Sequence, residues 1–275
     1  MKRIKLMAVA SVLLVTYSCT TVPLSGRNRL SFVNESEMQT AAAQSYTTLL
    51  KDPSTKVLNN ADAARVKRIG QQIATAVTRY MNANGHAAAI QGFKWEFNLI
   101  DSKEINAWCM PGGKVAVYSG ILPVTKDDAG LATVMGHEIA HAVAQHSSER
   151  ASKSAVAEGL GGLLGAATGG KSATTQQVIS QVYGISAQGF YLLPNSRTQE
   201  LEADHLGLIF MAMAGYNPSS AVSFWQRMAS ASAASQKPPE FLSTHPADAT
   251  RIAQIQKDLP EANKYLNSTT GKPKL

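Results

Sequence analysis

The spacing of apolar residues along the chain predicts a protein built mainly from amphipathic helices. Between residues 61 and 81, apolar side chains recur every three or four positions, which is the period of a helix with one buried face. Comparable patterns, bounded by proline, glycine or a capping residue, predict helices over residues 35–50, 129–150, 198–214, 218–234 and 247–259. Helices should therefore supply most of the core.

One region has the period of β-strands instead of helices. Apolar and polar side chains alternate there, and a Pro-Gly-Gly turn interrupts the alternation. The predicted extended segments are residues 95–100, 104–110 and 115–117. We therefore predict an α+β fold that is predominantly α, with a small antiparallel sheet next to the helix over residues 129–150.

Composition and charge narrow the class of protein. With 44% apolar and 16% charged residues in a chain of 275, the sequence matches a globular protein and excludes a disordered one. We expect a single domain over residues 35–275. The formal charge of +7 falls to about +4 without the three cations near the N-terminus, and the remaining cations form no dense run. We therefore expect no nucleic-acid partner.

The first nineteen residues have the organisation of a secretion signal. A basic start is followed by the apolar run 6–15, which is too short to span a bilayer, and then by Thr16-Tyr17-Ser18-Cys19. The pattern resembles bacterial lipoprotein signals, although Thr16 stands where those usually have leucine. We predict a lipoprotein signal peptide over residues 1–18, lipidation of Cys19 and a tether over residues 19–34.

This interpretation also predicts a location. The protein would be anchored by its lipid in a bacterial cell envelope, facing the periplasm, in the outer membrane. Two alternatives stay open at this point: an ordinary signal peptide with an incidental cysteine, or a disulfide between Cys19 and Cys109.

The predicted helix over residues 129–150 carries a metal-binding motif. His137 and His141 are four residues apart, so both imidazoles can reach one ion from the same helical face. Glu138 projects beside them, where a carboxylate can accept a proton from water. His146 is out of phase with these positions. The motif alone is a moderately specific signal, because two surface histidines on a helix would produce the same pattern.

A catalytic zinc site needs a third protein ligand and an open position for water. Glu158 is a weak candidate for that ligand because it borders the glycine-rich stretch 159–170. Glu200 is the better candidate, and Asp204 shares its helical face, from which one of the two can hydrogen-bond a ligand histidine. Glu202 points away from Glu200 and is interpreted as structural or solvent-facing.

Together these motifs resemble the forty-eighth family of metallopeptidases, which includes HtpX, BepA, LoiP, Oma-type mitochondrial proteases and the CAAX prenyl protease. The resemblance covers most of the chain after the signal, and it is closest to the soluble branch of the family. It is carried by Ser25-Gly26-Arg27, residues 106–113 (NAWCMPGG), the His-Glu-x-x-His motif, Ser196-Arg197, Glu200 with Asp204, and Ser243-Thr244-His245-Pro246 with Arg251.

The resemblance implies a zincin-like metallopeptidase domain with one Zn²⁺ ion per chain. The ion would be bound by His137, His141 and Glu200. Glu138 would act as the general base, and Asp204 would support the ligands from behind.

The same resemblance implies residues that bind the substrate and the transition state. His245 would donate a hydrogen bond to the oxyanion, and Arg251 would help to position it. The segment at Asn106 and Ala107 would present a sheet edge to which an extended substrate adds as a strand.

The predicted function is that of a zinc endopeptidase in quality control, with misfolded or unassembled envelope proteins as substrates. One alternative is a catalytically silent zinc-binding lipoprotein that acts as a scaffold, although such a protein would not need Glu138. A second alternative is a deformylase-like amide hydrolase with Cys109 as the third ligand. For residues 150–190, one interpretation is a lid or plug over the cleft. For the glycine-rich part, residues 159–170, the alternatives are a weak membrane-touching helix and a loosely packed surface connection.

Overall fold

The fold is given by a computed structural model, which describes residues 19–157, 185–186, 189–190, 196–233, 239–245 and 249–266. The predicted signal peptide over residues 1–18 lies outside the described residues, as does most of the predicted lid, residues 158–184 and 187–188. Among the helices that the structure describes, none has the length and apolar character needed to cross a membrane.

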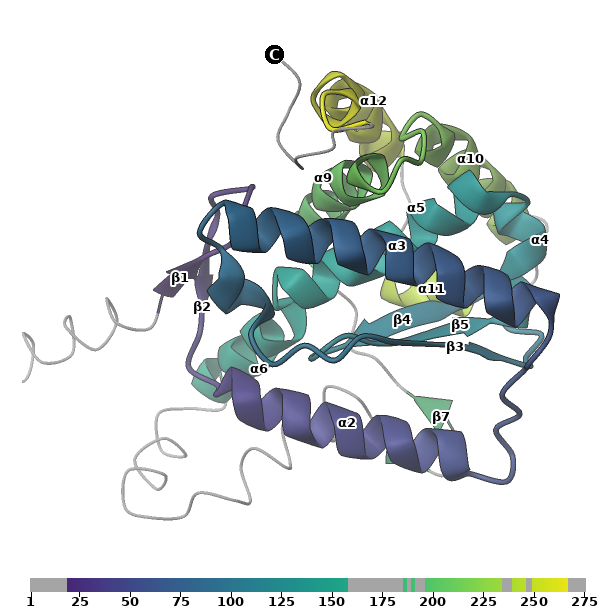
Figure 1. Ribbon diagram of the computed structural model, residues 1–275, viewed down its shortest axis with the longest axis horizontal. Helices are drawn as coiled ribbons and strands as arrows, with labels where there is room; N and C mark the ends of the chain where they lie inside the picture. The colour runs from purple at the N-terminus through teal and green to yellow at the C-terminus, as the bar shows by residue number, and fades with distance from the viewer. Residues whose placement is uncertain are drawn as a thin grey trace, which may run out of the picture.

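Helices predominate, as the apolar spacing predicts (Figure 1). The α-helices are α2 (Glu35–Lys51), α3 (Ala61–Ala83), α4 (Leu122–Thr125), α5 (Asp128–Val143), α6 (His146–Ala157), α9 (Arg197–Met213), α10 (Ser220–Ala233), α11 (Glu240–Thr244) and α12 (Ala249–Asn263). Two short 3-10 helices are η1 (Ala87–Ile90) and η2 (Ser119–Ile121). The strands are β1 (Cys19–Thr21), β2 (Asn28–Leu30), β3 (Glu96–Ile100), β4 (Ala107–Met110), β5 (Lys114–Tyr118), β6 (Ile185–Ser186) and β7 (Gly189–Phe190).

The central sheet has three strands in the order β3-β5-β4. β3 and β5 are parallel, whereas β4 and β5 are antiparallel. The predicted class, α+β and predominantly α, is therefore confirmed, but the sheet is mixed and not purely antiparallel. In this sheet β4 lies at an edge, which leaves one side of its backbone without a strand partner among the described strands.

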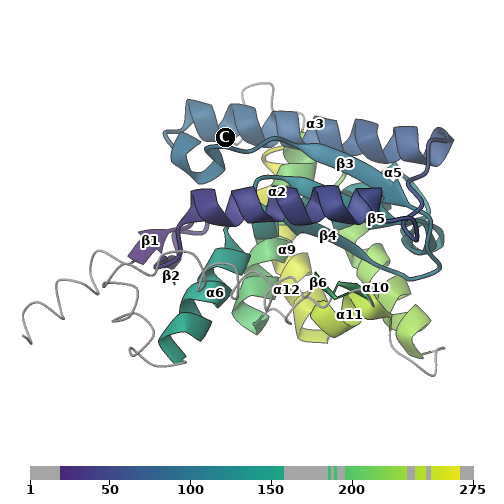
Figure 2. The same ribbon diagram turned by 90° about the horizontal axis from the view of Figure 1, so that it is seen from below.

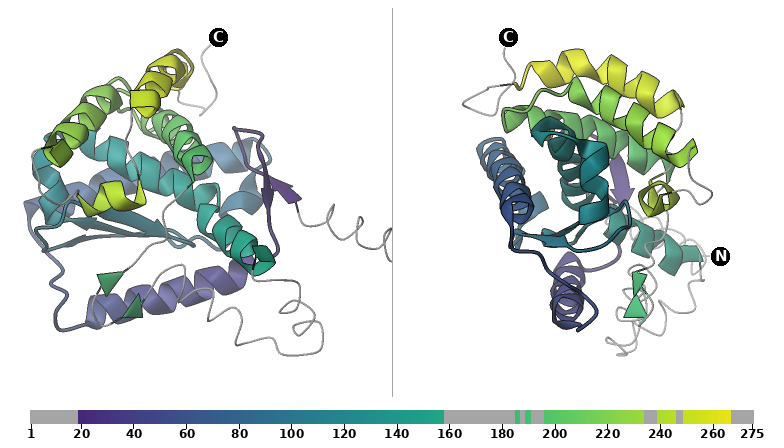
Figure 3. Two further views of the ribbon diagram at one scale, coloured as in Figure 1. Left: turned by 180° about the vertical axis from the view of Figure 1, so that it is seen from behind. Right: turned by 90° about the vertical axis from the view of Figure 1, so that its right-hand side faces the viewer.

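Both faces of this sheet are covered by helices (Figure 3). Val115 and Val117 of β5 face a large core cluster that includes α3, α5 and α9. Ala116, between them, faces a smaller cluster formed with α2. Successive strand residues point to opposite faces, so a strand buried on both sides needs the continuous apolar run that β5 has.

The helix that carries the histidine motif is shorter than the spacing predicts. Instead of one helix over residues 129–150, α5 ends at Val143 and α6 begins at His146. Gln145 interrupts them with a φ of +55°, a conformation that a helix cannot continue through. Its side-chain amide contacts Arg29 and the carbonyl oxygen of Ala89, which hold it in this turn. The break gives α6 a new direction.

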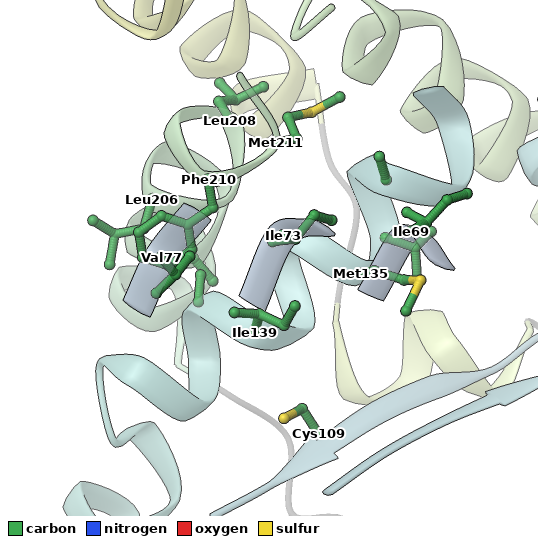
Figure 4. Close-up of a cluster of buried hydrophobic side chains, with 14 of the residues drawn as sticks. Ile69, Ile73, Val77, Cys109, Met135, Ile139, Leu206, Leu208, Phe210 and Met211 are labelled. Carbon is green, nitrogen blue, oxygen red and sulfur yellow. The ribbon is translucent and has the colours of Figure 1, made fainter. Parts of the chain in front are cut away.

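α5 and α9 cross with their backbones in close approach, at Gly136 and Gly207. A Cβ atom added to Gly136 would lie 2.8 Å from the carbonyl oxygen of Gly207, so larger residues would separate the two helices. Apolar side chains from α3, α5 and α9 surround the crossing, among them Ile73, Met135 and Leu206 (Figure 4). This packing fixes the distance between the two helices that carry the predicted metal ligands.

Candidate metal centre

Helix α5 presents the first part of the centre. Asp127 caps its N-terminus by accepting a hydrogen bond from the amide of Gly130 at 2.8 Å. His137, Glu138 and His141 follow in the middle and last turns of the helix, and all three are buried. Titratable side chains are seldom buried this deeply unless they have partners, so the partners define what the centre can do.

Helix α9 presents the second part. Ser196 and Gln199 form a capping box, in which each side chain bonds to the backbone of the other residue. The box fixes the first turn, and Glu200 lies in that turn with its carboxylate buried. Asp204 follows one turn later on the same face, also buried.

Four side-chain atoms from these helices and from the loop after α11 converge on one point. His137 Nε2 and His141 Nε2 are 3.0 Å apart, and each lies 3.3–3.4 Å from a carboxylate oxygen of Glu200. His245 Nδ1 lies 3.2 Å from His137 Nε2 and 3.0 Å from Glu200. These four residues could hold one metal ion, since one ligand atom of each lies within 4.8 Å of those of the others.

The spacing of these atoms fits a zinc ion. Ligand atoms about 2.0–2.1 Å from a tetrahedral Zn²⁺ are separated from one another by about 3.3 Å. The measured separations of 3.0–3.4 Å agree with that value. Imidazole nitrogens and a carboxylate are also the ligand types that zinc prefers.

The electrostatics of the cluster keep Glu200 available as an anionic ligand. Burial by itself would raise the pKa of Glu200, but His245, His141 and His137 outweigh burial and lower that pKa well below its usual value. Burial lowers the pKa of His141 well below its usual value, which favours the neutral imidazole that metals bind. Burial also acts to lower the pKa of His137, but Asp204 and Glu200 outweigh it and raise that pKa to about 9.

Glu138 lies beside the cluster without being part of it. Its Oε1 is 3.5 Å from His245 Nε2, and its carboxylate is almost fully buried. Burial is the main cause that raises the pKa of Glu138. A carboxylate with a raised pKa next to a metal position is suited to accept a proton from water and to donate it again.

His245 lies closer to the ligands than its predicted role requires. The family resemblance implies only a contact with the oxyanion, whereas Nδ1 of His245 lies among the clustered atoms and its Nε2 faces Glu138. It follows α11, a helix that the apolar pattern did not predict, and its ring packs against that of Phe241 with centroids 4.6 Å apart.

Arg251 links the elements that surround the centre. Its guanidinium forms ion pairs with Glu200 at 2.8 Å and with Asp204 at 2.7 Å, and it donates a hydrogen bond to the backbone oxygen of His245 at 3.3 Å. It also lies over the ring of Trp225 at 3.9 Å. Arg251 therefore contacts the backbone of His245 and both carboxylates of α9, and its role in positioning His245 stays a prediction.

Each ligand histidine has a partner behind it. His137 Nδ1 lies 3.0 Å from Asp204 Oδ1, so Asp204 faces the side of the imidazole that points away from the cluster, and its supporting role stays a prediction. His141 Nδ1 lies 2.7 Å from Nδ1 of His146, and Nε2 of His146 lies 2.7 Å from Glu202 Oε2. His146 and Glu202 therefore form a second supporting line that sequence reasoning missed.

The reason for the miss is the break at Gln145. On one continuous helix, His146 would point away from the ligands, and Glu202 would have no partner near Glu200. The turn carries His146 back under His141, and both His146 and Glu202 are buried. One feature of the sequence could have indicated this second line. Three titratable residues, His146, Glu149 and Glu202, lie on the same two predicted helices as the metal-binding motif and Glu200.

The remaining predicted residues lie near the centre or apart from it. Asn106 and Ala107 lie at the start of the edge strand β4, where the side-chain oxygen of Asn106 accepts a hydrogen bond from the amide of Ala107 at 2.9 Å. Cys109 is buried, its pKa is raised by burial, and it is not among the four clustered residues. Glu200 takes the place that the deformylase-like alternative gives to Cys109. Cys19 is exposed, and its lipidation stays a prediction.

Comparison with known proteins agrees with this geometry. Peptidase family M48 matches residues 60–259, the span that contains the four clustered side chains. The mitochondrial metalloendopeptidase OMA1 of Saccharomyces cerevisiae is 32% identical over 250 residues, which cover 88% of this chain and 69% of the yeast protein. The protein of the same name in Schizosaccharomyces pombe is 32% identical over 241 residues, covering 88% of this chain and 66% of that protein.

A bacterial relative matches over a shorter span. The beta-barrel assembly-enhancing protease of Escherichia coli strain K12 is 28% identical over 194 residues, which cover 66% of this chain and 38% of that protein. This chain thus spans about two thirds of the two yeast proteins and less than half of the bacterial one.

These comparisons contradict the location predicted from the N-terminal pattern. The prediction of a lipid-anchored, periplasm-facing protein of the bacterial outer membrane is wrong, because the relatives that match over 88% of the chain are mitochondrial metalloendopeptidases. The prediction rested on a basic and apolar pattern in eighteen residues, and such patterns specify a type of composition and not a membrane.

The match over residues 60–259, the similarity to metalloendopeptidases and a cluster whose ligand types and spacing fit zinc agree with one another. The chain therefore belongs to Peptidase family M48, and it is a zinc metalloendopeptidase.

Proposed function

We propose that this protein cleaves internal peptide bonds of polypeptides at the cluster of His137, His141 and Glu200, with Glu138 as the general base. The observation that carries the proposal is the convergence of three ligand side chains from two distant helices beside one buried carboxylate with a raised pKa. A purely structural zinc site has no need of a base at that position.

Zinc bound by these residues would supply an acidified water and polarise the scissile carbonyl. Glu138 would accept the proton of the water and return it to the leaving amine. Water needs a place among the ligand atoms, and His245 Nδ1 occupies one in the structure. The imidazole of His245 therefore has to turn out of the cluster during turnover, and from there its ring can donate to the oxyanion.

The substrate would bind as an extended strand along β4. That strand lies at an edge of the sheet, and its first residue, Ala107, follows the buried Asn106. The backbone oxygen of Ile105, just before the strand, accepts a hydrogen bond from the amide of Phe241, in the helix that leads to His245. An edge that adds a strand requires an unfolded stretch of polypeptide, which favours misfolded or unassembled proteins as substrates.

The test is zinc content together with peptide hydrolysis for the wild-type protein and for Glu138→Gln. The variant should keep its zinc and lose about 10²–10⁴-fold in kcat, because it keeps the shape of the site but lacks a base. Glu96→Gln, a change of the same kind on a carboxylate that pairs with Lys114, is the matched control and should cleave like the wild type.

The main alternative is a zinc-binding scaffold without catalytic activity. It would be supported if the wild-type protein bound zinc tightly but cleaved neither unfolded proteins nor a peptide library. Cleavage that survives in Glu138→Gln would contradict the role of that residue.

A further inference from the structure

A line of polar contacts runs from the ligand His141 to the N-terminal part of the chain. It passes from His141 to His146 and then to Glu202, with 2.7 Å between the bonded atoms at each step. Glu202 then accepts hydrogen bonds from Arg27, from Nε at 2.9 Å and from Nη2 at 2.7 Å. Glu202 is also bonded by the hydroxyl of Ser25.

Zinc bound to His141 would determine which ring nitrogens carry hydrogen along this line. If His141 binds zinc through Nε2, its Nδ1 carries a hydrogen and must donate it. Nδ1 of His146 then has to be an acceptor, so the hydrogen of that ring is on Nε2, from which it is donated to Glu202. Glu202 Oε2 is then the acceptor at the end of these two steps.

Arg27 orients the carboxylate of Glu202. Two N–H groups on one edge of its guanidinium donate to Glu202 Oε2, the same oxygen that His146 Nε2 faces. The other edge of the guanidinium is bonded to Glu149, with Nη1 and Nη2 at 2.9 and 2.8 Å from its two oxygens. A planar guanidinium can bridge two carboxylates in this way, whereas a lysine cannot.

Arg27 is brought there by a short hairpin that is docked on the body of the protein. β1 and β2 pair antiparallel between Cys19 and Leu30 and lie beside α6 (Figure 2). Val22, in the turn between them, is buried in the main core cluster. The segment predicted as a tether is thus packed against the helices that carry His146 and Glu202.

We propose that the N-terminal hairpin is a component of the metal centre, and that Arg27 is a positioning residue for His141 acting through Glu202 and His146. The inference rests on the proposed function, in which His141 binds zinc. Each of the two histidines of α5 would then be oriented by a line of polar contacts. The line from His137 passes through Asp204 to Arg251. The line from His141 passes through His146 and Glu202 to Arg27. Both lines end on an arginine outside α9.

The test compares two buried carboxylates that share the same arginine. Glu202→Gln and Glu149→Gln are the same chemical change on the two partners of Arg27, but only Glu202 contacts His146. Zinc dissociation constants would be measured by competition with a chromophoric chelator, and the ligand field by the visible spectrum of the Co²⁺ form. Partners behind a ligand histidine are worth about 10–100-fold in metal affinity.

We expect Glu202→Gln and Arg27→Met to weaken zinc binding about tenfold or more and to change the Co²⁺ spectrum, with Arg27→Lys intermediate. Glu149→Gln should bind zinc within about threefold of the wild type. The double variant Arg27→Met/Glu202→Gln should bind zinc no more than about threefold more weakly than the worse single variant, because both changes act on one line.

Three outcomes would overturn the inference: wild-type affinity in Glu202→Gln, an equal loss in Glu149→Gln, or losses that add fully in the double variant. If Arg27→Met fails to fold, the Glu202→Gln and Glu149→Gln pair still decides the question. His141→Ala distinguishes a failure of the proposed metal site from a failure of the proposed role of Arg27. Wild-type zinc affinity in His141→Ala would show that the proposed metal site is wrong. Weakened zinc binding in His141→Ala, with wild-type affinity in the Arg27 and Glu202 variants, would refute the role of Arg27 alone.

Discussion

Gly207 of α9 is in van der Waals contact with the backbone of His137 on α5. A Cβ atom added to Gly207 would lie 2.9 Å from the amide nitrogen of His137 and 3.0 Å from its Cα, closer than side chains approach a backbone. The absence of a side chain at one position of α9 thus sets the separation between the helix that carries two histidines and the helix that carries Glu200.

The first prediction concerns this helix crossing. Gly207→Ala should push α9 away from α5, destabilise the fold by about 1–3 kcal/mol through overpacking, and weaken zinc binding by displacing Glu200. Thermal unfolding and chelator competition would measure the two effects. Gly85→Ala is the control, because Gly85 has a φ of +76° and open space around it. It should destabilise the fold but leave zinc affinity unchanged. Normal zinc affinity in Gly207→Ala would contradict this account of the crossing.

The second prediction concerns the support of His137. Asp204→Asn should weaken zinc binding about 10–100-fold, because it removes the anion that faces His137 Nδ1 at 3.0 Å and that pairs with Arg251. Asp258→Asn is the matched control, since Asp258 faces His205 at 3.4 Å, outside the cluster. The measurement is zinc affinity at constant pH. Equal zinc affinities in Asp204→Asn and Asp258→Asn would show that Asp204 does not support the metal centre.

The third prediction separates two roles of His245. His245→Ala removes one of the four clustered side chains, but it leaves the two histidines and the carboxylate that suffice for a catalytic zinc site. We expect zinc to be retained and kcat to fall about 10²–10³-fold, the typical effect of losing one oxyanion donor. Zinc content and steady-state hydrolysis measured on the same sample would check both parts. Loss of the metal would instead make His245 an obligatory ligand.

The fourth prediction concerns stability in acid. The pKa values of Glu149 and Glu202 are lowered to about 2 in the folded protein, because hydrogen bonds from Arg27 and other donors outweigh the effect of burial. Lowered folded-state pKa values add stability that is complete above about pH 4.5, and this stability is lost as the pH falls from there toward 2.

Denaturant unfolding between pH 7 and pH 2.5 would test this effect. The free energy of unfolding of Glu149→Gln should fall less steeply with acid than that of the wild type, because one of the two titrating carboxylates is absent. Parallel acid profiles for the two proteins would show that the Arg27 cluster does not contribute in this way.

Much of the candidate site could be predicted from the sequence alone. The spacing of His137 and His141 places both on one helical face whatever the rest of the chain does. The recurrence of acidic residues four apart at Glu200 and Asp204 selects one face of a second helix for the same reason. Apolar spacing located α3 and α9 to within a few residues, because burial of one face imposes the period of the helix on the sequence.

The residues that hydrogen-bond the histidine His141 on the side away from the cluster could not be predicted in this way. His146 and Glu202 acquire their roles from a turn at Gln145 and from the docking of Arg27, which is 175 residues away from Glu202 in the chain. Local periodicity records which face of an element is buried, but it does not record which distant element covers that face.

The sequence by itself determined the mainly helical class, the placement of His137 and His141 on one helical face and the placement of Glu200 and Asp204 on one face of a second helix, because each depends on spacing within one element. Only the tertiary structure decided that His245 reaches the ligand cluster, that the sheet is mixed and that the N-terminal hairpin supports His141. These features depend on contacts between segments far apart in the chain, where the energy of packing and not the period of one element selects the partner.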